Sequence, residues 1–186
     1  MDEYVRIYSL SHDEIAPKIF SFSFEKRWEH KCEPRTLAIE VVNQNEMLIG
    51  SFMKIKKINI EKNKVQDILT SGEIWKIKKF SHSYPLIACT ASKTIEIIDL
   101  RTNKVVQRFP KLTQEVKCFE TIPDHTVIYG ASKEIGMFDD RKLSSVLWSD
   151  SAFHLGPIVD IIKLQNKIIS GDMKGGIYSW EPRKLM

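Results

Sequence analysis

Acidic or amide residues recur at a regular interval along the chain, and an arginine follows most of them. The first set is Asn59, Asp99, Asp139 and Glu181, separated by 40, 40 and 42 residues, and Arg101, Arg141 and Arg183 follow the last three, each two residues later. An arginine beyond a strand end can bind a partner's carboxylate or carbonyl through two parallel hydrogen bonds. The alternative is that each pair orders its own turn and contributes little. The three arginines are therefore candidate partner-binding residues.

Trp28 is a further candidate, because an exposed tryptophan is enriched at protein interfaces. A buried structural role for this side chain stays open. The chain also contains Lys-Ile-Lys-Lys twice, at 54–57 and 76–79, which is either a basic stripe for phosphate groups or two solvated strand faces. With a net charge of only +4 and no aromatic residues between the lysines, we favour solvated faces and do not expect nucleic acid as a partner.

Other side chains with chemical potential do not form a recognisable constellation. The five histidines fall in predicted loops or turns, without a nucleophile or a ligand spacing beside them. Three cysteines without paired spacing indicate reduced, buried thiols. We therefore predict no catalytic residues, no metal site and no cofactor, and expect that the protein is not an enzyme. No apolar run approaches the ~20 residues of a membrane helix, and we expect a cytoplasmic or nuclear protein.

The elements that carry these residues are short alternating strands, joined by turn residues. Comparison of 86–109 with 126–149 gives 7 identities in 24 positions, among them Ala-Ser-Lys at 91–93 and 131–133. A repeat of 40–45 residues with four strands per unit is typical of β-propeller blades. Antiparallel pairing follows, because the connections are too short for helical crossovers.

The repeats divide the chain into one all-β domain over residues 1–186. We predict N-terminal strands within 3–25, a loop at 26–35, and repeat units at 36–72, 73–112, 113–155 and 156–186. Each unit has four candidate strands, except that the last one lacks its fourth. In the third unit the last strand is predicted at 144–148.

On these residues the chain resembles the WD-repeat β-propellers. The Trp-Asp pair that ends the third strand of that family's repeats here reads Ile58-Asn59, Ile98-Asp99, Phe138-Asp139 and Trp180-Glu181. The resemblance covers roughly Thr36–Glu181 and, weakly, the N-terminal strands. The family's Gly-His pair is absent, and His154 before Gly156-Pro157 is at best a displaced remnant, which argues against the buried hydrogen-bond relay that this histidine joins.

Four or five blades are fewer than the seven that this family usually closes into a ring. The strand at 18–25 could complete the last blade, but we expect an open arc or a fragment of a longer propeller, whose missing blades come from a partner or from further sequence.

The resemblance implies a non-catalytic scaffold or adaptor that binds one or more proteins. One alternative is a substrate receptor of a cullin-RING ubiquitin ligase, because a Trp-Asp-x-Arg pattern docks some WD-repeat proteins on these ligases. The other is a basic-faced module that binds RNA or lipid.

Overall fold

The computed structural model describes residues 4–16, 19–31, 36–80, 85–122, 125–142, 145–165 and 167–181, the first two segments by their backbone alone. The chain divides into two compact units, Met1–Thr36 and Leu37–Met186. The four predicted repeats lie in the second unit. Every described element is a β-strand.

The first unit is a two-stranded antiparallel sheet of β1 (Tyr4–Ala16) and β2 (Ile19–Lys31). The prediction of a loop from residue 26 is wrong as far as Lys31, because β2 continues through the charged segment and pairs with β1, placing Trp28 opposite Ile7. His12 and His30 accordingly lie on strands and not in loops. The strand at 18–25 was a candidate to complete the last blade, but β2 pairs with β1.

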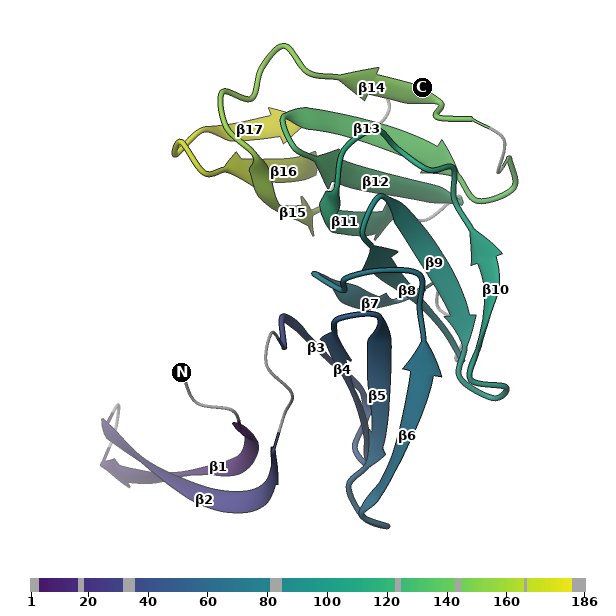
Figure 1. Ribbon diagram of the computed structural model, residues 1–186. Helices are drawn as coiled ribbons and strands as arrows, with labels where there is room; N and C mark the ends of the chain where they lie inside the picture. Colours follow the sequence, from purple (N-terminus) through teal and green to yellow (C-terminus); the bar gives the residue numbers. More distant parts are fainter. Residues whose placement is uncertain are drawn as a thin grey trace. The chain divides into compact units, whose positions relative to one another are not determined.

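The second unit contains four antiparallel sheets, each built from strands that are consecutive in the sequence (Figure 1). The first sheet has β3 (Ala38–Asn43), β4 (Glu46–Ser51), β5 (Lys54–Asn59) and β6 (Lys64–Leu69). The second has β7 (Ile77–Lys79), β8 (Leu86–Ala91), β9 (Thr94–Asp99) and β10 (Lys104–Arg108). The third has β11 (Val116–Ile122), β12 (Thr126–Ala131), β13 (Glu134–Asp139) and β14 (Trp148–Asp150). The fourth has β15 (Ile158–Leu164), β16 (Lys167–Asp172) and β17 (Ile177–Trp180). These sheets are β-propeller blades, as the repeat period predicts.

The second and third strands of the first three sheets share one register. Ser51 pairs with Lys54, Ala91 with Thr94 and Ala131 with Glu134, so a two-residue turn joins the strands each time. Such a turn requires a positive φ, which Met53, Ser92 and Ser132 adopt. The recurrence of Ala-Ser-Lys in the sequence therefore marks a repeated backbone conformation.

The last strand of the third sheet lies later than predicted. β14 begins at Trp148, whereas the sequence pattern placed this strand at 144–148. Trp148 pairs with Met137 and packs against the core between the third and fourth sheets, so burial of its ring fixes the register.

The core consists of three clusters, each formed between two consecutive sheets. Ile55 belongs to the cluster between the first and second sheets, Ile95 to the next, and Ile135 to the cluster between the third and fourth. The first strands of neighbouring sheets lie next to each other, since β3 contacts β7 and β11 contacts β15. Among the described residues, none of the three clusters joins the fourth sheet to the first.

Candidate partner-binding surfaces

The acidic or amide residue at the end of each third strand caps the turn that follows it. The side-chain oxygen accepts a hydrogen bond from a backbone N–H of that turn: Asn59 from Lys62 (2.8 Å), Asp99 from Arg101 (2.8 Å) and Asp139 from Arg141 (2.9 Å). Carboxylate and amide side chains favour this local bond, which closes a turn around two or three residues. The signature therefore has a structural role at all three positions.

The two arginines also clasp their own aspartates. The Nε of Arg101 donates to Oδ1 of Asp99 at 3.1 Å and its Nη2 to Oδ2 at 2.7 Å, and Arg141 makes the same two bonds to Asp139 at 2.9 and 2.8 Å. These hydrogen bonds hold the pKa of both aspartates below its usual range. The two arginine side chains are 71% and 62% exposed.

Two of the four candidate partner-binding residues cannot be placed in this way. Arg183 lies outside the described residues, and Trp28 is described by its backbone on β2 alone. Glu181 follows β17 and is exposed, whereas Trp180 is the last residue of that strand and is half-buried.

Four side chains of the fourth sheet and the loop before it form a buried hydrogen-bond relay. Trp180 Nε1 donates to Oγ of Ser170 at 2.7 Å, Ser170 Oγ lies 2.8 Å from Nε2 of His154, and His154 Nδ1 lies 3.1 Å from Oδ2 of Asp172. The expectation that the relay is missing is wrong here, and His154 is a buried residue rather than a surface histidine. The sequence signal was the presence of all four residue types in one repeat.

The Asp172 carboxylate is the ionised end of the relay. Burial would raise the pKa of Asp172, but hydrogen bonds from His154 and from the backbone N–H groups of Gly176, Lys174 and Gly156 outweigh it and lower the pKa to about 2. The ionised carboxylate therefore accepts a hydrogen bond from Nδ1–H of His154, and the Ser170 hydroxyl, which accepts from Trp180, lies beside Nε2 of the same ring. Each of the four side chains of the relay has a hydrogen-bond partner.

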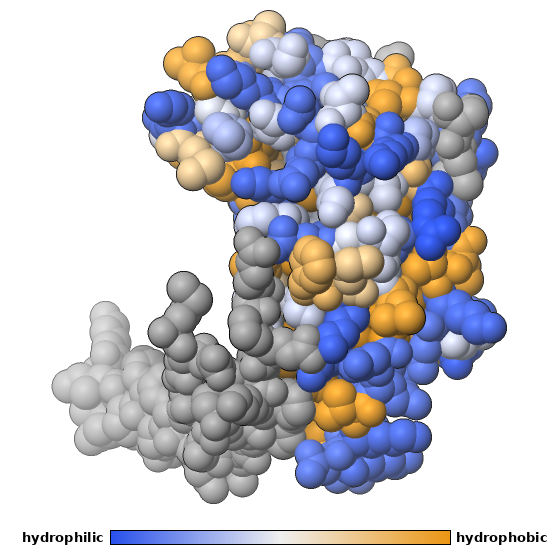
Figure 2. Space-filling view, viewed as in Figure 1, coloured by the Kyte–Doolittle hydropathy of each residue, from blue (hydrophilic) through white to orange (hydrophobic). Residues whose placement is uncertain are grey.

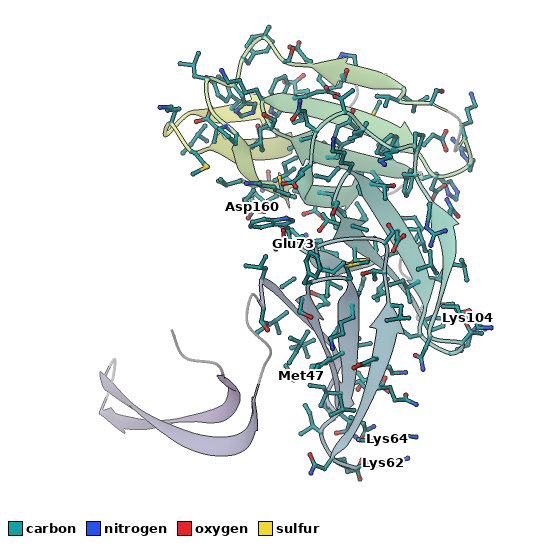
Figure 3. All side chains as sticks on the ribbon, in the orientation of Figure 1. Met47, Lys62, Lys64, Glu73, Lys104 and Asp160 are labelled. Carbon is teal, nitrogen blue, oxygen red and sulfur yellow. The ribbon has the colours of Figure 1, made fainter. Side chains whose placement is uncertain are left out.

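The two Lys-Ile-Lys-Lys segments are largely neutralised by carboxylates. The ion pairs are Lys54–Asp67 (3.7 Å), Lys57–Glu46 (3.5 Å), Lys76–Asp160 and Lys78–Glu120. Asp160, labelled in Figure 3, lies on the first strand of the fourth sheet and thus connects this sheet to the second. Because these cations have protein partners, we do not carry the RNA or lipid hypothesis forward.

The turns between second and third strands form a second candidate surface, which we call the turn face. Backbone bonds fix these turns to the following sheet: Val116 N–H donates to Ser92 O and Ile158 N–H to Ser132 O, both at 2.7 Å. The turn face also includes the loop before β15, because Met173 N–H donates to Pro157 O at 2.9 Å. Large exposed apolar side chains lie on it, namely Phe52, Met53, Phe153, Leu155 and Met173.

Metal and membrane sites were also sought among the described residues. No group of three or more His, Cys, Asp or Glu side chains there is placed to hold a metal ion. None of the described segments is a helix with the length and apolar character needed to cross a membrane.

Comparison with known proteins identifies the fold but no relative by sequence. The sequence matches no family model and no curated protein. The solved structures that it resembles include the computationally designed Ika4 protein, with a TM-score of 0.66 and 15% identity over 80% of this chain and 92% of that chain. The computationally designed Ika8 protein is similar with a TM-score of 0.63 and 15% identity, over 82% of this chain and 46% of that one. At this identity the likeness shows the fold alone.

Proposed function

We propose that this chain is a non-catalytic scaffold of the WD-repeat type that holds another protein on its turn face. The observation that carries the proposal is the set of exposed apolar side chains at the two ends of this face: Phe52 and Met53 on the first sheet, and Phe153, Leu155 and Met173 on the fourth. Exposed apolar patches on soluble proteins are typical of interaction sites. The relay in the fourth sheet supports the WD-repeat assignment.

The rigidity of the turn face favours binding. Each of the two central turns is bonded to the first strand of the next sheet, so its backbone is ordered before a partner arrives. Binding a partner then costs less conformational entropy in the turns of this chain. A few large apolar side chains can supply most of the binding energy. We place the complex in the cytoplasm or nucleus, which imaging of a fluorescent fusion tests.

The test is affinity capture with turn-face variants of the full chain. Leu155→Ser and Met173→Ser remove exposed side chains and should abolish retention of a defined partner, whereas Val106→Ser, on the outermost strand of the second sheet, should leave it unchanged. Circular dichroism spectra identical to that of the wild type would establish that each variant is folded. Retention of the same proteins by all three variants would exclude the turn face as the binding surface.

A second candidate function is that of a substrate receptor in a cullin-RING ubiquitin ligase. The observation in its favour is the pair of exposed arginines, Arg101 and Arg141, held in the same geometry at equivalent strand ends. Cullin subunits should then be captured by the wild-type chain and by the control Lys133→Ala, and lost from the double variant Arg101→Ala/Arg141→Ala. Absence of cullin subunits from the wild-type capture would remove this function and leave the scaffold proposal intact.

A further inference from the structure

One face of the fourth sheet is apolar and exposed. Ile162 and Leu164 on β15 and Ile177 on β17 point to this face, and they are 46%, 58% and 76% exposed. Figure 2 shows hydrophobic residues at the surface of this part of the molecule. The opposite face of the same sheet is buried, because Ile161 and Ile168 belong to the core shared with the third sheet.

The repeat shows what the exposed face is built to contact. In every sheet an isoleucine of the third strand pairs with the next-to-last residue of the second strand; the pairs are Ile55–Gly50, Ile95–Thr90, Ile135–Gly130 and Ile177–Gly171. Ile55, Ile95 and Ile135 are 0% exposed, and each packs against the following sheet. Ile177 occupies the same position with the same side chain, and its place in the repeat is that of a residue covered by a further sheet.

The first sheet has the matching face, which is exposed along its first strand, whereas Met47 and Ile49 on β4, which pair with Val41 and Ile39, are 2% exposed. Ala38 and Val42 of β3 pack toward the second sheet, so Ile39 and Val41 point to the opposite face, where they are 50% and 59% exposed. In the other three sheets, this face packs against the preceding sheet. Each internal interface joins the following side of one sheet to the preceding side of the next. The fourth sheet therefore offers a free face of the first kind, and the first sheet offers a face of the second kind.

We propose that two copies of this chain associate head to tail, with the fourth sheet of each packed on the first sheet of the other. The contact continues the established interface between consecutive sheets, so it requires no new type of packing. Two such contacts related by a twofold axis close a ring and cover both exposed faces of both copies, whereas a contact that did not close would give a filament. This inference goes beyond the scaffold function, which a monomeric chain could also perform.

Sedimentation velocity of the full chain across the micromolar range tests the proposal. We expect twice the mass of one chain for the wild type, and the mass of one chain for Ile177→Lys and for Val41→Lys. Val106→Lys is the matched control, because it introduces the same charge at an exposed position that belongs to neither face, and it should keep the doubled mass. A wild-type chain of single mass, or a series of larger species, would overturn the closed pair.

Mixing the two variants tests the head-to-tail arrangement. Ile177→Lys keeps an intact first sheet and Val41→Lys keeps an intact fourth sheet, so an equimolar mixture should regain the doubled mass through one wild-type contact. If fourth sheets packed on each other instead, Val41→Lys alone would keep the doubled mass, which would contradict the proposal. Ile162→Lys provides a second variant of the fourth sheet, and its mass should also fall to that of one chain.

Discussion

Substitution of Ser170 tests the buried relay of the fourth sheet most directly. The Ser170→Ala variant removes the hydroxyl that accepts from Trp180 at 2.7 Å and lies 2.8 Å from His154 Nε2. Two hydrogen bonds of about 1 kcal/mol each are lost, and the indole N–H of Trp180 and Nε2 of His154 are left without this partner, for a total of about 2–4 kcal/mol. For a chain of this length, that corresponds to a fall in Tm of about 5–15 °C.

Urea unfolding followed by circular dichroism measures this loss. Ser179→Ala is the matched control, since Ser179 is exposed on the neighbouring strand and its variant should stay within about 0.5 kcal/mol of the wild type. In a Trp180→Phe background, Ser170→Ala should cost less, because the indole donor is already absent. If Ser170→Ala were as mild as the control, the relay would not stabilise the fold and the reasoning above would be refuted.

Three further predictions concern the core, a close approach and acid stability. Ile95→Ala should lower the free energy of unfolding by about 2–5 kcal/mol in urea titrations, because the side chain is fully buried between two sheets. Gly136→Ala should cost about 1–3 kcal/mol in the same assay, since its Cβ would approach the Tyr129 ring at 2.3 Å. The lowered pKa of Asp172 stabilises the fold fully above pH 3.8, and this contribution disappears as the pH falls towards about 2, so the stability difference between wild type and Asp172→Asn should shrink over that window in acid titrations.

The fold could be predicted from the sequence because each sheet is built from neighbouring strands. Local turns such as Ala91–Thr94 recur with one register, so a period of about 40 residues carries over directly into stacked sheets. The extension of β2 to Lys31 was missed because its charged residues do not alternate with apolar ones, and pairing with β1 supplied the order instead. β14 starts later than predicted because Trp148 packs against the core between the third and fourth sheets, and strand propensity does not predict which residue is buried there.

The candidate site was less predictable, because its parts are brought together by the sheet. His154 meets Ser170 and Asp172 across 16 and 18 residues, from the loop that precedes the sheet. The sequence leaves two roles open for Arg101 and Arg141, a local pair with the strand-end aspartate or a contact with a partner. In the structure each arginine pairs with its aspartate and its side chain is also exposed to solvent.

The relay occurs in the fourth sheet, while an aromatic pair occupies the equivalent positions in the third. Tyr129 on β12 pairs with Gly136 on β13, and at the equivalent positions of the fourth sheet Ser170 on β16 pairs with Tyr178 on β17. The tyrosine is therefore on the second strand in the third sheet and on the third strand in the fourth. The Tyr129 ring stacks on Phe138 at 4.7 Å, and its hydroxyl donates to Glu134 at 2.7 Å.

This exchange is understandable from what each sheet can bury. The third sheet has cores on both faces, so large aromatic side chains fix its position by packing alone. The fourth has three described strands and one exposed face, and therefore gains less from apolar burial. A fully paired buried relay compensates, because it fixes strand register and loop position through directional bonds that a smaller core cannot supply. The buried polar relay thus lies in the sheet whose packing is least complete.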